Sequence, residues 1–236
     1  LWALLPALGW SWFGQDPTAL VVLLQAMLMA SILRITLSWE KALLAGSFLG
    51  IVTGLMLPLV YPDLLNDLVQ AGVRFYEEYN AEIASSLGSE LETVIRQTMN
   101  ASMAGTYLVI GVCMTMLARS WQAGLYNPGG FRTEFHSLRL SPAIAVICVI
   151  TMVAGPVLGL NSMLLGWVGG LPLFVAGLAL VHGVVGRKHL SGQWLVLFYL
   201  ALVLLGPSLM ILLVVMAFVD SWLDIRRRMK PSGPAE

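Results

Sequence analysis

Residues 140–186 read LSPAIAVICVITMVAGPVLGLNSMLLGWVGGLPLFVAGLALVHGVVG and contain no Asp, Glu, Lys or Arg. A helix crosses a hydrocarbon core of about 30 Å in roughly 20 residues, and it satisfies its backbone polar groups internally, as lipid requires. These 47 residues are therefore long enough for two crossings. We predict two membrane-spanning helices here, separated where Gly155, Pro156, Gly159 and Asn161 interrupt the stretch.

Charge-free intervals recur along the rest of the chain, at residues 1–15, 17–33, 42–62, 97–118 and 189–219. The composition agrees, with 58% hydrophobic residues, 11% charged residues and a mean hydropathy of +0.83, whereas an ordinary soluble domain has about 25% charged residues. We predict an all-α, polytopic transmembrane helix bundle that forms a single integral membrane domain over residues 1–236. Six complete spans are expected, at 17–37, 42–61, 97–117, 193–219 and twice within 140–186, after a partial N-terminal span at 1–13 that begins before Leu1.

The span 42–61 carries Ala42, Gly46, Gly50 and Gly54 at every fourth position. Helices in lipid associate through close packing, and a face of small residues lets two backbones approach each other. We expect this face to lie at the centre of the bundle. The weaker alternative is that glycine is simply frequent in membrane helices.

Residues 62–96 form the only long polar stretch, and their apolar positions recur at steps of three and four. The pattern predicts an extramembrane amphipathic helical cap, with Gly88 as a helix stop. Its seven acidic and two basic residues argue against attraction to anionic lipid. A solvated structural cap is the favoured interpretation, and a substrate lid is the alternative.

Residues 119–140 concentrate polar and aromatic groups in a chain that elsewhere avoids them. One interpretation is an interfacial helix anchored by aromatic and arginine side chains, and the other is a ligand-binding or partner-binding site. Glu134 and His136 are two positions apart and point to different sides of a helix, so we expect no catalytic residue, metal site or cofactor, and no enzyme. The candidate binding residues are Arg119, Asn127, Gly129, Gly130, Phe131, Glu134 and Arg139.

The distribution of charge raises a conflict about topology. Alternating spans place seven bases on one side, which the positive-inside rule makes cytoplasmic, and the acidic cap on the other. These bases are Arg34, Lys41, Arg119, Arg132, Arg139, Arg187 and Lys188. Six spans would then send the bases of the polar C-terminal tail, residues 220–236, to the outer side. Either the tail breaks the rule, or residues 193–219 fold as a short hairpin around Gly206-Pro207. We favour a cytoplasmic C-terminus. At the end of this stretch Asp220, Asp224 and Arg228 follow one another at four-residue spacing, which predicts an ion-paired helix end.

Three runs, 119–121 (RSW), 127–140 (NPGGFRTEFHSLRL) and 220–228 (DSWLDIRRR), resemble the YybS-like family of bacterial inner-membrane proteins. The resemblance implies a fold similar to the S-components of energy-coupling-factor vitamin transporters and to the rod-shape membrane protein MreD, without implying a substrate. S-components dock their coupling subunit through an Ala-xxx-Ala face, and Ala26 and Ala30 offer such a pair here.

Two functions remain open. The first is an S-component-like subunit that binds or transports a small solute; the alternative is a non-catalytic scaffold or assembly partner that docks through residues 119–140. Membrane lipid, other membrane protein subunits and a small molecule are the expected partners. The zero net charge gives no reason to expect a nucleic acid.

Overall fold

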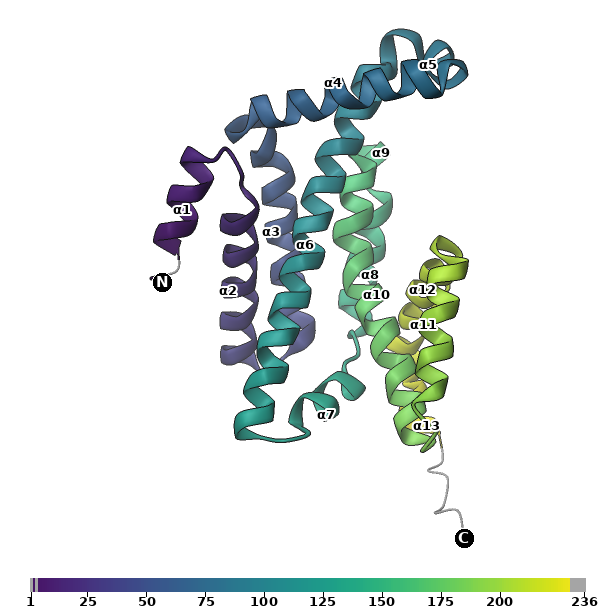
Figure 1. Cartoon of the computed structure of the whole chain (residues 1–236). Coiled ribbons are helices and arrows are strands. Elements are labelled where there is room, and N and C mark those ends of the chain that lie inside the picture. The colour runs from purple at the N-terminus through teal and green to yellow at the C-terminus, as the bar shows by residue number, and fades with distance from the viewer. Residues whose placement is uncertain (1, 3, 230–236) are drawn as a thin grey trace.

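The computed structural model describes residues 2 and 4–229, and it is helical throughout, without a β-strand in that part of the chain (Figure 1). Residues 230–236 of the predicted polar tail lie outside the described residues. The elements are α1 Leu4–Phe13, α2 Thr18–Thr36, α3 Trp39–Val60, α4 Pro62–Tyr79, α5 Ala81–Leu87, a 3-10 turn η1 Gly88–Glu90, α6 Leu91–Tyr126, α7 Gly130–Ser137, α8 Pro142–Val153, α9 Gly155–Leu158, α10 Ser162–Arg187, α11 Gln193–Leu205, α12 Pro207–Leu223 and α13 Ile225–Arg228.

Long apolar helices make up the body of the molecule and indicate a multi-pass membrane protein. Among the described residues, four segments are long and apolar enough to cross a membrane: Thr18–Thr36, Trp39–Val60, Ala81–Tyr126 and Ser162–Arg187. A fifth is obtained if α7 and α8, which are bent by 69° relative to each other, count as one span. The count of six complete spans is therefore not confirmed. The predicted partial span at residues 1–13 contains α1, a helix of ten residues packed beside α2 (Figure 1).

The glycine face of α3 lies against three neighbouring helices. A Cβ atom on Gly46 would meet Met29 of α2, and one on Gly50 would meet Leu108 of α6 and Val168 of α10. Polar groups join the same interfaces, because Ser47 Oγ donates to Val168 O at 2.8 Å and Asn100 Nδ2 donates to the carbonyl of Gly54. The glycines thus allow α2, α6 and α10 to pack closely around α3. In contrast, Ala26 is half-buried and Ala30 is exposed on the outer side of α2.

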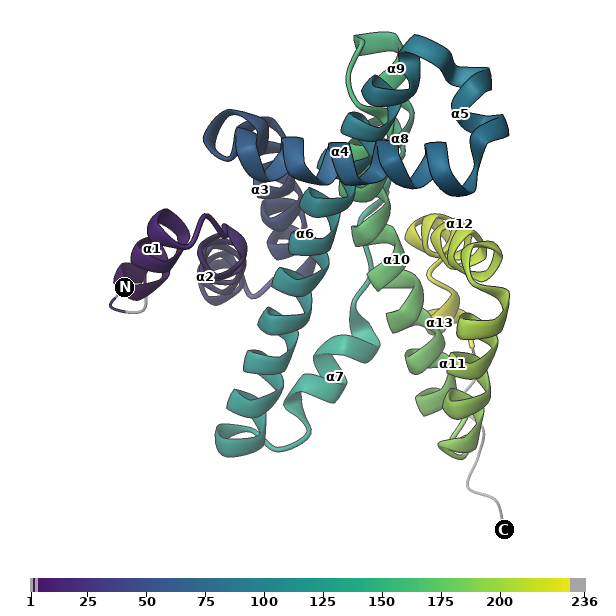
Figure 2. The same cartoon turned by 45° about the horizontal axis from the view of Figure 1, so that its top comes forward.

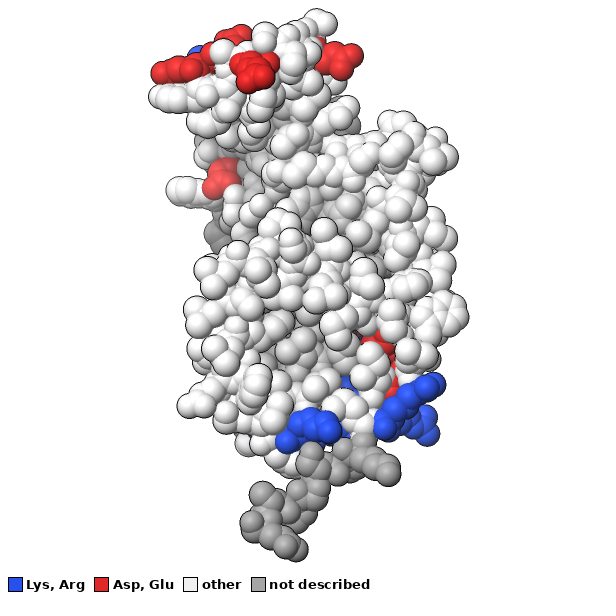
Figure 3. Space-filling model, turned by 90° about the vertical axis from the view of Figure 1, so that its right-hand side faces the viewer, with Lys and Arg blue, Asp and Glu red and all other residues white. Residues whose placement is uncertain are grey.

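Helices α4 and α5 lie across one end of the bundle, which we call the cap end (Figures 1 and 2). The inner face of α4 buries Leu65 and Val69 against Leu91 and Ile95 of α6. Its outer face carries the acidic residues, and Figure 3 shows acidic side chains gathered at the cap end and basic side chains gathered at the opposite end, which we call the basic end. Uncharged surface separates the two ends, as expected of a protein that crosses a bilayer.

The stretch predicted as the sixth span is instead a hairpin of two short helices. Helix α11 has 13 residues and α12 has 17, which correspond to lengths of about 20 Å and 26 Å, less than the hydrocarbon core. Gly206, with a φ of +47°, makes the turn between them. Both helices start or finish at the basic end (Figure 1). The hairpin alternative is therefore the one observed, and it places α13 beside α7.

A cationic cleft at the basic end as the candidate functional site

The turn at Asn127-Pro-Gly-Gly reverses the chain after α6 and starts α7. Gly129 adopts a φ of +86°, which favours glycine, and the Gly130 amide donates to the carbonyl of Asn127 at 2.9 Å. Gly130 also packs directly on the Asn127 side chain. These three candidate residues therefore shape the turn that brings α7 back under the bundle, between α6 and α10 (Figures 1 and 2).

The Glu134 carboxylate ties α7 to α6 and α3. Arg119 donates to it through both Nε, at 3.0 Å, and a terminal nitrogen, and the Trp39 indole donates to Oε2 at 3.3 Å. The Arg119 guanidinium, helped by Trp39, lowers the pKa of Glu134 despite its partial burial. Phe131 packs edge-on against Trp39 and stacks on Phe135. Arg119, Phe131 and Glu134 thus anchor α7. Both oxygens of the Glu134 carboxylate already accept hydrogen bonds from within the protein.

Arg139 and the C-terminal helices meet on the other side of α7. Arg139 donates to the carbonyl of Ser221 at 3.2 Å, and its guanidinium lies 3.7 Å from the Asp224 carboxylate. Arg226 forms a buried ion pair with Asp220 at 2.9 Å. The sequence suggested pairing of Asp224 with Arg228 along one helix. In the structure Asp224 pairs with Arg139 and Asp220 pairs with Arg226, because Asp224 ends α12 in a left-handed turn.

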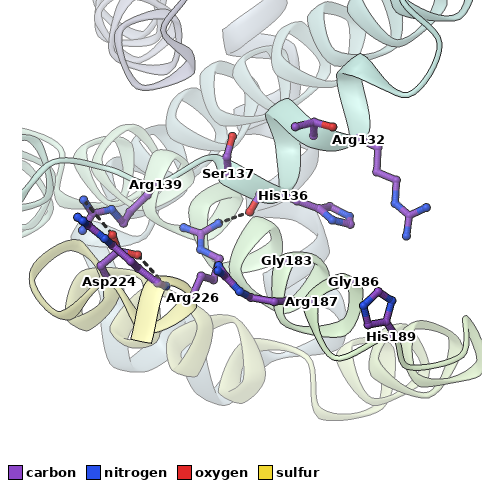
Figure 4. A pocket seen from close by; sticks show the side chains of 12 residues that line it. Arg132, His136, Ser137, Arg139, Gly183, Gly186, Arg187, His189, Asp224 and Arg226 are labelled. Atoms are coloured by element: carbon purple, nitrogen blue, oxygen red, sulfur yellow. Dashed lines mark hydrogen bonds and ion pairs between the residues drawn. The ribbon is translucent and has the colours of Figure 1, made fainter. Parts of the chain in front are cut away.

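A cleft of about 760 Å³ opens between α7, the end of α10 and α13 (Figure 4). Asp224 is the single carboxylate among its lining residues. Two of its five arginines have carboxylate partners, Arg139 with Asp224 and Arg226 with Asp220. No ion pair joins Arg132, Arg187 or Arg227 to a carboxylate anywhere in the described chain. The cleft therefore carries an excess of positive charge.

A second cavity of about 460 Å³ adjoins the first and shares Arg132, His136, Gly186 and His189 with it. Its remaining lining residues are His182, Val185, Leu190, Gly192 and Leu195. In Figure 4, Arg132 from α7 and His189 from the loop after α10 point toward each other across the opening. All three histidines of the chain thus lie around the two cavities.

Two glycines on α10 make this arrangement possible. A Cβ atom on Gly183 would lie 2.7 Å from the carbonyl oxygen of His136 and 2.8 Å from Arg226 Cδ, and one on Gly186 would lie 2.7 Å from the His136 ring. The same close approach lets Arg226 donate to the carbonyls of His136 at 2.7 Å and of Leu138 at 2.8 Å. Helices α7, α10 and α13 are thereby fixed around one cleft.

Burial lowers the pKa of His136, and the nearby charges of Arg132, His182 and Arg226 lower it further. The His136 imidazole is therefore biased toward its neutral form, and the positive charge of the cleft comes from its arginines. His182 Nε2 and the Tyr199 hydroxyl share a hydrogen bond of 2.8 Å. In residues 2 and 4–229, no group of three or more His, Cys, Asp and Glu side chains is placed to hold a metal ion.

The arrangement suits anion binding by guanidinium groups. Of the seven candidate residues, Arg139 lines the cleft, whereas the other six build the turn and the anchor of α7. Sequence reasoning missed Arg132, His136, Arg187, His189 and Arg227 as members of one site. Only the excess of bases at helix ends on this side of the molecule indicated them.

Comparison with protein-family models, curated proteins and solved structures finds no match for this chain, so the YybS-like resemblance stays a prediction.

Proposed function

We propose that this multi-pass membrane protein is a subunit that binds, and helps to transport, a small anionic solute through the cationic cleft at its basic end. The observation that carries the proposal is the set of three arginines without carboxylate partners, Arg132, Arg187 and Arg227, around one open cleft. Guanidinium groups bind phosphate and carboxylate through paired hydrogen bonds, and a bound anion would offset the positive charge of the cleft.

The cleft has the dimensions of a ligand site, because small-molecule pockets usually enclose about 300–1,000 Å³ and this one encloses about 760 Å³. We place the protein in a bacterial inner membrane with the basic end in the cytoplasm, following the positive-inside rule. The exposed Ala30 and half-buried Ala26 leave the outer side of α2 open for a coupling subunit, in keeping with an S-component-like role.

The test is anion binding by the purified full chain in mild detergent. Inorganic phosphate and diphosphate should raise the melting temperature more than chloride at equal ionic strength. The gain should fall in Arg132→Gln and persist in Arg34→Gln, since Arg34 is also exposed but lies outside the cleft. Equal responses to all three anions would contradict the proposal.

The scaffold alternative has its own supporting observation. The end of α6 exposes Trp121, Leu125 and Tyr126 at 68%, 77% and 83%, and aromatic residues are enriched in protein interfaces. If this surface docks a partner, Trp121→Ser with Tyr126→Ser should release a co-purifying membrane protein while anion binding stays unchanged. Arg132→Gln should instead weaken anion binding and leave the co-purifying membrane protein bound.

A further inference from the structure

The two adjoining cavities share four lining residues and differ in the others. The cleft toward α13 is lined by five arginines, and the second cavity adds to its polar lining the apolar side chains of Val185, Leu190 and Leu195, which we call the apolar wall. We infer that together they bind a phosphate-bearing lipid, with its headgroup in the cleft and its apolar chain along this wall. The inference rests on the proposed function in that both require the cationic cleft to bind an anion, but it assigns that anion to a lipid headgroup and not to a free solute.

The position of the cavities fits such a ligand. They lie at the basic end, where the uncharged surface of the protein stops and lipid headgroups would begin (Figure 3). Leu195 of the apolar wall belongs to α11, and this helix also exposes Trp194 and Leu197, at 56% and 57%. A chain that leaves the second cavity beside Leu195 would meet the apolar side chains exposed on α11. Basic pockets between helices on the cytoplasmic side of membrane proteins commonly hold anionic headgroups.

The count of unpaired arginines selects among lipid headgroups. A phosphodiester carries one negative charge, whereas a phosphomonoester carries about −1.5 to −2 at neutral pH. Three guanidinium groups, those of Arg132, Arg187 and Arg227, line the cleft without carboxylate partners in the described chain. A single diester would leave most of this charge uncompensated. The preferred headgroup is therefore a phosphomonoester or one that carries two phosphates.

The first experiment measures lipid retention by the full chain in detergent with native mass spectrometry. Phosphatidic acid is the phosphomonoester probe, phosphatidylglycerol the diester probe and phosphatidylcholine the uncharged control. We expect phosphatidic acid to bind about tenfold or more tightly than phosphatidylglycerol, because the second charge adds charge-assisted hydrogen bonds. Equal retention of phosphatidic acid and phosphatidylglycerol would overturn the selection of a phosphomonoester.

Variants then locate the site. The double variant Arg132→Gln with Arg187→Gln should weaken phosphatidic acid binding by about tenfold or more, and Arg34→Gln with Arg74→Gln, two exposed arginines outside the cavities, should leave it unchanged. Should the first double variant fold poorly, Arg227→Gln provides the same test from α13. Equal binding by the cleft and control variants would overturn the placement of the lipid.

A soluble competitor separates the lipid from a free solute. Leu190→Gln with Leu195→Gln alters the apolar wall and should weaken phosphatidic acid but leave diphosphate binding intact. If diphosphate binds as tightly as phosphatidic acid and this variant changes neither, the ligand is a soluble anion; the lipid inference fails while the proposed function stands. If neither probe binds the wild-type chain, both fail.

Discussion

Arg226 and Asp220 are the most enclosed charges at the basic end, exposed by 7% and 2%. Besides their ion pair, Arg226 donates to the carbonyl of His136 in α7 and to that of Leu138, which follows α7, and Asp220 accepts from the Ile225 amide at 2.7 Å. Arg226→Met should destabilise the protein by about 3–5 kcal/mol, because it leaves the Asp220 carboxylate buried without a counter-charge. Unfolding in detergent, followed by circular dichroism, measures the change.

The matched control for this prediction is Arg228→Met, since Arg228 belongs to the same short helix but is exposed. The double variant Arg226→Met with Asp220→Leu should regain part of the lost stability, as it removes both charges together. Equal stability of the Arg226 and Arg228 variants would refute the buried-pair account.

His136 offers a direct readout of anion binding. Its pKa is lowered by burial and then by Arg132, His182 and Arg226, which face it from α7, α10 and α13. A bound anion offsets the arginine charges and should raise this pKa, so the protein takes up a proton on binding. For a fixed protonation state of the anion, affinity should therefore increase as pH falls below the pKa of His136 in the bound state, and level off below its pKa in the free state. Histidine-selective NMR titration with and without diphosphate checks both values.

At the scale of elements, the packing of α3 depends on a side chain being absent at Gly50. A Cβ atom there would lie 3.2 Å from Leu108 and 3.4 Å from Val168, so the further atoms of a leucine would overlap both helices. Gly50→Leu should destabilise the bundle by about 1–3 kcal/mol or more. Gly166→Leu in α10 is the control, because its Cβ would meet nothing within 4 Å. Equal melting temperatures for the two variants would show that α3 tolerates a larger separation.

The elements that the sequence predicts well are those decided by local chemistry. Pro142 starts α8, Asn161 caps α10 through the amides of Met163 and Leu164, and Pro62 begins the cap helix α4. Hydropathy could not settle residues 193–219, because a membrane span and a hairpin of two short apolar helices have the same composition. Only the length of each helix and the turn at Gly206 separate them.

At the scale of the whole molecule, the cleft joins α7, α10 and α13, which are far apart in the chain. Arg226 contacts residues 88 and 90 positions earlier, at Leu138 and His136. No local pattern encodes such pairs, so sequence reasoning could identify the polar segment 119–140 but not the partners that complete its surface. Sequence reasoning also could not predict that the Glu134 carboxylate accepts hydrogen bonds from both Arg119 and Trp39, since Trp39 lies 95 positions away.

The hairpin makes a prediction about topology that six complete spans would not make. With α11 and α12 both meeting the basic end, the C-terminal bases share one side of the membrane with α7, opposite the acidic cap (Figure 1). In a background with Cys113→Ala and Cys148→Ala, a membrane-impermeant thiol reagent applied to intact cells should label Glu78→Cys in α4. The same reagent should leave Thr133→Cys and Arg228→Cys unlabelled until the cells are opened. If intact cells label Arg228→Cys but not Thr133→Cys, residues 193–219 cross the bilayer. Helices α13 and α7 would then lie on opposite sides of the membrane and could not form the cleft.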